Sequence, residues 1–122
     1  MQRTARVHVR EERGAFVVVA SGAFDYDERD LLPAAWDEAQ ERGLSLTVAD
    51  LSAVAFGDSS FLDALLVGRR RHRATGQRLV LVGPLSTTVL KLLTITNVLE
   101  HFEIVESLTE ALGSGPRGTA GS

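Results

Sequence analysis

Hydrophobic and polar residues alternate along the chain in ways that predict short strands and helices. Residues 15–20 and 79–82 are apolar at every position, and such runs are typical of strands covered on both faces. Residues 6–10 and 44–50 alternate between apolar and polar side chains, which also indicates strands. Apolar side chains recur at helical spacing in four further segments, at about 31–42, 61–73, 87–96 and 108–112.

A short apolar run at 102–105 adds a last strand, so the predicted order is β-β-α-β-α-β-α-β-α. Strands that alternate with helices favour a parallel sheet with right-handed crossovers, here after a first hairpin at residues 11–14. The predicted fold class is therefore α/β, with a mixed sheet of four to five strands and about four helices. One shared core is expected from Val17, Val19, Trp36, Val48, Leu65, Leu66, Leu79, Leu81 and Leu93.

The length of 122 residues predicts one domain. Residues 1–6 are polar and are expected to be frayed, and residues 7–112 form the domain. Residues 113–122 are rich in glycine and contain no large apolar side chain, so a disordered tail is expected there.

Composition narrows the function classes. The chain has no cysteine, and its three histidines lie far apart in the sequence, so neither a metal site nor a cofactor is expected. No apolar run reaches the ~18 residues of a membrane span, and no signal peptide is evident, which favours a cytoplasmic protein. A net charge of −3 gives no general attraction to nucleic acid or to a membrane surface. The basic cluster Arg69–Arg73 is interpreted as a solvated helix end.

Asp58, Ser59 and Ser60 lie where the strand at 44–51 and a short connection give way to the helix at 61–73. A helix start offers unpaired N–H groups and a partial positive charge. These side chains therefore have two interpretations. They cap the helix, with Ser60 and Asp63 at the spacing of a capping box, or they mark a place where a phosphate group is held.

Two kinds of enzyme share parts of this sequence pattern. Gly57-Asp58-Ser59 resembles the nucleophile turn of serine hydrolases, but such enzymes need a histidine oriented by an acid. Neither His72 nor His101 stands in that arrangement. Asp50 could be the phosphoacceptor of a response regulator, but residues 20–23 lack the acidic pair that would hold magnesium. The chain is therefore predicted not to be an enzyme.

Five stretches of the sequence resemble the STAS domains and, among them, the bacterial anti-sigma factor antagonists. The most specific is Asp50–Ser60, and the resemblance covers about residues 7–112. The supporting stretches are Gly22–Asp25, Leu81–Pro84, Leu92–Thr96, and Phe102–Ile104 followed by Ser107-Leu108.

The resemblance implies a protein switched by contact with a partner. In such proteins, a kinase that is also an anti-sigma factor phosphorylates the serine after the aspartate, and a phosphatase resets it. The unphosphorylated form binds the kinase and frees the sigma factor. The matching phosphoacceptor is Ser59, and the implied partner-binding residues are Asp25, Asp58, Ser60, Phe61 and Leu62.

Two departures from the family pattern lie on this implied contact face. The family usually continues with Gly-Leu-Gly after the serines, whereas this chain has Phe61, Leu62 and Asp63, and Ala23 replaces an acidic residue. Either the partner differs in shape, or phosphorylation has been lost and a phosphorylation-independent scaffold remains. Phe61 itself either turns inward, on one helix face with Leu65 and Gly68, or stays outward as a partner anchor.

Overall fold

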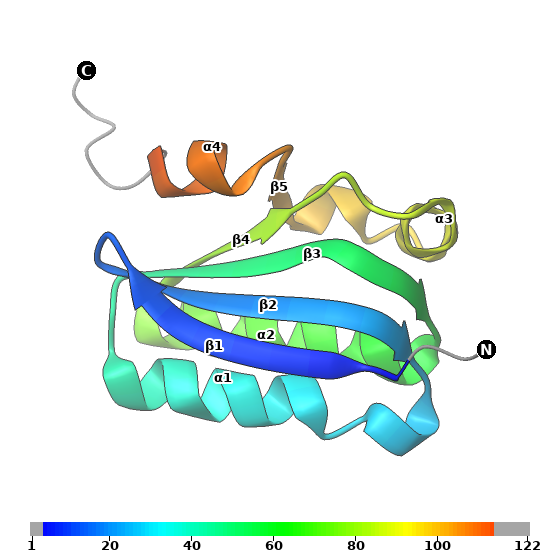
Figure 1. The fold of residues 1–122 in the computed structure, drawn as a ribbon, viewed down its shortest axis with the longest axis horizontal. Helices are drawn as coiled ribbons and strands as arrows, with labels where there is room; N and C mark the ends of the chain where they lie inside the picture. The colour runs from blue at the N-terminus through cyan, green and yellow to red at the C-terminus, as the bar shows by residue number, and fades with distance from the viewer. Residues whose placement is uncertain (1–3, 114–122) are drawn as a thin grey trace.

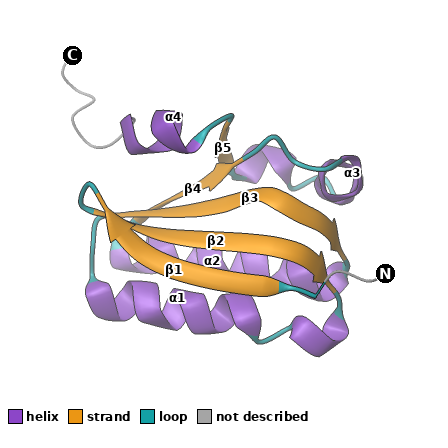
Figure 2. Ribbon diagram, viewed as in Figure 1, coloured by secondary structure: helices purple, strands orange, loops and turns teal. Residues whose placement is uncertain are grey.

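A computed structural model describes residues 4–113 and shows one mixed five-stranded sheet with helices packed against it (Figures 1 and 2). The strands are β1 (Arg6–Glu12), β2 (Ala15–Phe24), β3 (Leu46–Gly57), β4 (Arg78–Val82) and β5 (Glu103–Val105). The helices are α1 (Leu31–Arg42), α2 (Ser59–Thr75), α3 (Thr87–Ile95) and α4 (Leu108–Gly113), with short 3-10 helices η1 (Tyr26–Glu28) and η2 (Leu99–His101). The predicted fold class and element order are confirmed.

The strands lie in the order β1-β2-β3-β4-β5, with β1 antiparallel to β2 and the later pairs parallel. The hairpin between β1 and β2 turns at Arg13 and Gly14, whose φ angles are 53° and 79°. Positive φ at both central residues is the geometry of a type I′ turn, whose twist matches that of paired strands.

The apolar side chains form two clusters, one on each face of the sheet, and the prediction of a single core is wrong in this respect. Trp36 of α1, Leu65 of α2 and Leu81 of β4 are buried in the cluster between these helices and the sheet. Val17 and Val48 are buried on the other face, in the cluster that includes Ala111 of α4. Because successive side chains of a strand point to opposite faces, a sheet covered on both sides divides its core.

β2 and β3 are both longer than the sequence predicted. Residues 21–24 and 52–57, expected to be a strand break and a connection, pair with each other through Gly22↔Val54 and Phe24↔Gly57. The pairing shifts register twice, between Val19 and Ser21 and again between Gly22 and Ala23, as it does at β-bulges. Gly22 has φ of 93°, and a Cβ there would lie 2.4 Å from the carbonyl oxygen of Thr4, so glycine is required.

The predicted domain boundaries need small changes at both ends. Thr4 forms a bridge with Ala23, and Ala5 is buried, so the expected frayed segment does not extend over these residues. Gly113 closes α4 instead of opening the tail. The rest of the predicted tail, residues 114–122, and residues 1–3 lie outside the described residues.

α1 and α2 lie side by side against one face of the sheet (Figure 1). The indole of Trp36 is fully buried between them, and its Nε1–H donates to the carbonyl oxygen of Ala64 at 2.8 Å. Gly68 makes this approach feasible, because a Cβ there would lie 2.5 Å from Cε2 of the indole.

His72 is a buried polar residue beneath the same indole. Its Nδ1 lies 2.7 Å from the carbonyl oxygen of Gly68 and its Nε2 lies 2.9 Å from Oγ1 of Thr47. A neutral imidazole fits both contacts if Nδ1–H donates to the carbonyl and Nε2 accepts from the hydroxyl. The pKa of His72 is lowered, because the effect of burial is larger than the opposing effect of the hydrogen bond with Gly68.

The free energy of unfolding is expected to fall as the pH drops below about 6.5, the ordinary histidine pKa. Because the pKa of His72 is lowered in the folded chain, the unfolded chain binds the proton more readily. The contribution of neutral His72 to stability is fully present above the pKa that this histidine has in the unfolded chain. It is lost as the pH falls from there toward the lower pKa of His72 in the folded chain. Urea unfolding between about pH 7.5 and pH 5 measures this loss. The control variant His8→Gln, at an exposed position, should show the same loss of stability with falling pH as the unaltered protein. If His72→Gln also shows the same loss, His72 is not its source.

Candidate functional site

Two strand ends bring the candidate residues together at one edge of the sheet. Phe24 at the end of β2 is in register with Gly57 at the end of β3, and the backbone N–H of Asp58 donates to the carbonyl oxygen of Phe24 at 3.2 Å. Asp25 therefore begins η1 beside the point where Asp58 begins α2. This is the carboxyl edge of the parallel strands, where side chains from separate connections meet.

Asp58 is the N-cap of α2. Its Oδ1 accepts from the backbone N–H groups of Ser60 at 2.9 Å and Phe61 at 3.3 Å, and from the Ser60 hydroxyl at 2.6 Å. Partial burial raises the pKa of Asp58, but these hydrogen bonds outweigh it and the pKa is lowered. The expectation that Ser60 and Asp63 form a capping box is wrong, because the carboxylate of Asp58 already occupies the cap.

The two serines differ in accessibility. Ser59 is the first residue of α2, it is exposed, and its hydroxyl has no hydrogen-bond partner among residues 4–113. Ser60 is half-buried, and its hydroxyl is engaged by Asp58. Since the aspartate does the capping, the fold does not need the hydroxyl of Ser59, which is free for chemistry or contact.

Phe61 turns inward, as the first of its two alternatives predicted. Its side chain is 2% exposed, and its ring centroid lies 5.3 Å from that of Phe24. Gly57 makes room for the ring, because a Cβ there would lie 2.3 Å from Cδ2 of Phe61. The expectation that Phe61 itself contacts a partner is therefore corrected, since the ring supports the loop and helix from within.

The remaining predicted residues lie at the start of η1 and in the first turns of α2. Asp25 is exposed and caps η1, where its Oδ1 accepts from the N–H of Asp27 at 2.9 Å. The Glu28 carboxylate accepts from the Asp25 N–H in return, and its own pKa is raised chiefly by its side-chain hydrogen bond with Asp25. Leu62 is half-buried, and Asp63 is exposed one residue further along α2.

Sequence reasoning missed two exposed aromatic residues in these same segments. Tyr26 follows Asp25 and is 62% exposed, with the Arg29 guanidinium 3.9 Å from its ring centroid. Phe56 directly precedes Gly57 and is 41% exposed. The sequence does place an aromatic residue beside each predicted site motif. Because exposed aromatic residues are enriched at interaction sites, this placement could have indicated both.

The arrangement does not supply a histidine base to Ser59. His72 lies on the same helix about 20 Å further along its axis, at a rise of about 1.5 Å per residue. The carbonyl oxygen of His101 accepts from Arg69, which is also in the second half of α2. Within the described part of the chain, no group of three or more metal-ligating side chains gathers. Nor is any helix there both long and apolar enough to span a bilayer.

A family model described as Mlab, STAS domain, matches residues 7–106, which is most of the chain. The chain belongs to the STAS domain family. No curated protein matches it. The predicted resemblance to STAS domains is thereby confirmed, and the element order read from the pattern is that of this family.

Solved structures of anti-sigma factor antagonists share this fold. One from Mycobacterium paratuberculosis is 26% identical, with a TM-score of 0.75 over 91% of this chain and 93% of that one. The phosphorylated form of the Bacillus cell fate determinant SpoIIAA is 20% identical, with a TM-score of 0.68 over 88% and 97%. A STAS domain protein from Planctomyces limnophilus is 24% identical, with a TM-score of 0.70 over 91% and 98%.

Proposed function

We propose that this STAS domain acts in the cytoplasm as an anti-sigma factor antagonist, with Ser59 as its phosphoacceptor. The observation that carries the proposal is the free, exposed hydroxyl of Ser59 at the first turn of α2, beside a carboxylate that already caps the helix. The likeness to antagonist structures, one of them of a phosphorylated form, supports the same role. The partner would be an anti-sigma factor with kinase activity, and a phosphatase would reset the switch.

The helix start shapes what a phosphate on Ser59 would do. The phosphate would be stabilised by about 0.3–1 kcal/mol by the partial positive charge of the helix terminus. It would find few N–H donors, because Asp58 already accepts from those of Ser60 and Phe61. The phosphate would therefore remain hydrated and would leave the fold unchanged.

Charge and hydration would instead act on the partner. A phosphate adds about −1.5 to −2 charges, next to the carboxylate of Asp58 and near the loop of Asp25. A partner that covers this surface would have to desolvate the phosphate against like charges. A loss of about 2.8 kcal/mol lowers affinity a hundredfold, which a buried, repelled phosphate can supply.

Incubation with an anti-sigma factor kinase from the same organism and ATP, followed by peptide mass mapping, tests the acceptor. We expect one phosphate, located on Ser59, in the unaltered protein and in Ser60→Ala, and none in Ser59→Ala. A phosphate on Ser60, or none while the kinase still binds, would reject Ser59 as the acceptor.

The second candidate is a STAS scaffold that binds its partner without phosphorylation. The observation that favours it is the pair of departures at Phe61 and Asp63, where the family usually has glycines. Asp63 is exposed and adds a negative charge one turn from Ser59, which a kinase would have to tolerate. In that case the mapping experiment would find stable partner binding in the presence of ATP and no phosphate.

A further inference from the structure

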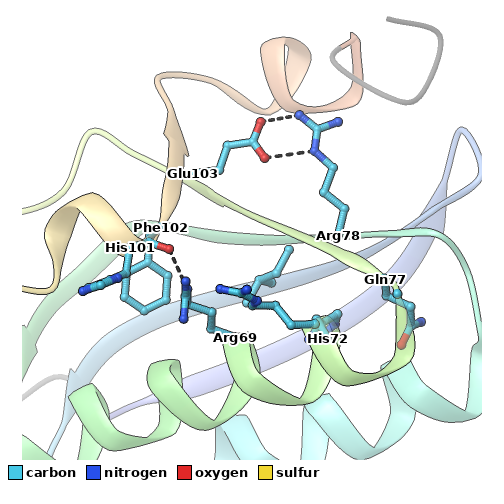
Figure 3. A pocket seen from close by; sticks show the side chains of 10 residues that line it. Arg69, His72, Gln77, Arg78, His101, Phe102 and Glu103 are labelled. Carbon is cyan, nitrogen blue, oxygen red and sulfur yellow. Dashed lines mark hydrogen bonds and ion pairs between the residues drawn. The ribbon is translucent and has the colours of Figure 1, made fainter.

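A pocket of about 350 Å³ lies beside the second half of α2, whereas Ser59 begins the helix. Figure 3 shows the side chains that line this pocket. β5 pairs only with residues 80–82 of β4, so the start of β4 is open on that side. Arg69, His72 and Arg73 line the pocket from α2, and Gly76 lines it just beyond the end of the helix. Leu79 and Phe102 add an apolar surface, and His101 and the pair formed by Arg78 and Glu103 complete the wall.

The charges of the pocket do not cancel. Arg78 donates to Glu103 through two nitrogens, one of them at 2.9 Å, so this pair is neutral together. Nε of Arg69 donates to the carbonyl oxygen of His101 at 2.7 Å (Figure 3), and within residues 4–113 its other two nitrogens have no partner. The side chain of Arg73 has no hydrogen-bond or ion-pair partner within residues 4–113. The lining therefore carries two uncompensated guanidinium groups in a chain whose net charge is −3.

The helix end does not neutralise this charge. The C-terminus of α2 carries about half a negative charge, and basic residues there often only complement it. Two guanidinium groups exceed that partial charge about fourfold. The neighbouring Arg71 shows the alternative fate of an arginine on this helix, since it is paired with Asp37 at 2.8 Å outside the pocket.

From this geometry we infer that the pocket binds a small organic phosphate monoester with a flat apolar group. The charge of a phosphate monoester, about −1.5 to −2 at neutral pH, matches the two guanidinium groups of Arg69 and Arg73. Guanidinium forks fit phosphate oxygens with paired hydrogen bonds. Leu79 and Phe102 offer the apolar surface on which the rest of the ligand lies. The volume is within the range of small-molecule sites.

Phenyl phosphate is the probe, because it joins a phosphate monoester to a single flat ring. NMR titration of the full chain should show saturable shifts confined to residues 69–79 and 101–103. Phenol lacks the charge and inorganic phosphate lacks the ring, so both should bind at least about tenfold more weakly. Arg73→Gln should weaken phenyl phosphate binding by about tenfold or more, the loss expected for one charge-assisted contact.

Arg70→Gln is the matched control, because it removes the same charge from an exposed position of α2 that does not line the pocket. It should change the affinity less than about twofold, as should Ser59→Ala, which leaves this inference independent of the proposed phosphorylation switch. Equal losses in Arg73→Gln and Arg70→Gln would show diffuse charge attraction and would overturn the inference. So would the absence of saturation, or shifts located elsewhere.

Discussion

Phe61→Gly is expected to lower the free energy of unfolding by about 4–6 kcal/mol. The substitution removes a buried ring that packs on Phe24 and fills the space left by Gly57. Truncation of a core phenylalanine costs about 3–5 kcal/mol, and glycine in a helix adds about 1 kcal/mol. Urea unfolding of the variant and the unaltered protein at one pH measures the difference.

Asp63→Gly is the matched control for this prediction. It places the same glycine in the same helix, at an exposed position, and restores a residue that the family usually has there. We expect it to cost at most about 1 kcal/mol, the helix penalty of glycine relative to alanine. If Phe61→Gly costs no more than Asp63→Gly, the ring of Phe61 is not part of the core and the inward placement is wrong.

Trp36→Ala is expected to lower the free energy of unfolding by about 3–5 kcal/mol. The indole joins α1 to α2 through its hydrogen bond to the carbonyl oxygen of Ala64 and lies edge-on to the ring of His72, with centroids 5.6 Å apart. Its removal leaves a cavity between the two helices that small neighbouring residues cannot fill. Thermal or urea unfolding gives the cost directly.

The contact between Trp36 and Gly68 predicts a change of sign in a double mutant. In the unaltered protein, Gly68→Ala forces a Cβ to within 2.5 Å of the rigid indole, and such overpacking costs about 1–3 kcal/mol. In Trp36→Ala the same substitution meets no indole, and the better helix propensity of alanine should stabilise by up to about 1 kcal/mol. The same sign in both backgrounds would show that the indole does not restrict position 68.

The helices could be predicted from the sequence because each has a local signal for its face and its end. In α1, the stripe formed by Leu32, Ala35, Trp36 and Ala39 is buried as the spacing indicated. Gly43 follows α1 with a left-handed φ of 66°, the C-terminal stop that glycine favours. Asn97 follows α3 with a φ of 62°, a left-handed conformation that asparagine tolerates better than most residues.

The strand ends could not be predicted, because their residues have weak β propensity. Ser21, Gly22 and Ala23 indicated a break by composition, yet they pair with the second half of β3 through irregular register. Backbone pairing across the sheet satisfies the N–H and C=O groups of these residues whatever their side chains. The extension matters for function, since it carries Phe24 and Gly57 to the edge where Asp25 and Ser59 follow.

The sequence indicated which residues form the candidate site, but not which of them caps the helix and which stays free. A run of one aspartate and two serines offers several capping patterns, and the sequence alone does not decide among them. The structure assigns the cap to Asp58, which leaves Ser59 free and engages Ser60. The burial of Phe61 depends on Gly57 and Phe24, which meet the ring only in the folded chain.

The most direct test of the proposed switch is the affinity of an anti-sigma factor kinase from the same organism for Ser59 variants. Ser59→Ala should bind like the unaltered protein, and Ser59→Asp should bind at least about tenfold more weakly, because it adds a charge to the contact surface. Ser45→Asp adds the same charge at the exposed residue before β3, far from α2's first turn, and should bind normally. Equal affinity of Ser59→Asp and Ser45→Asp would contradict the account.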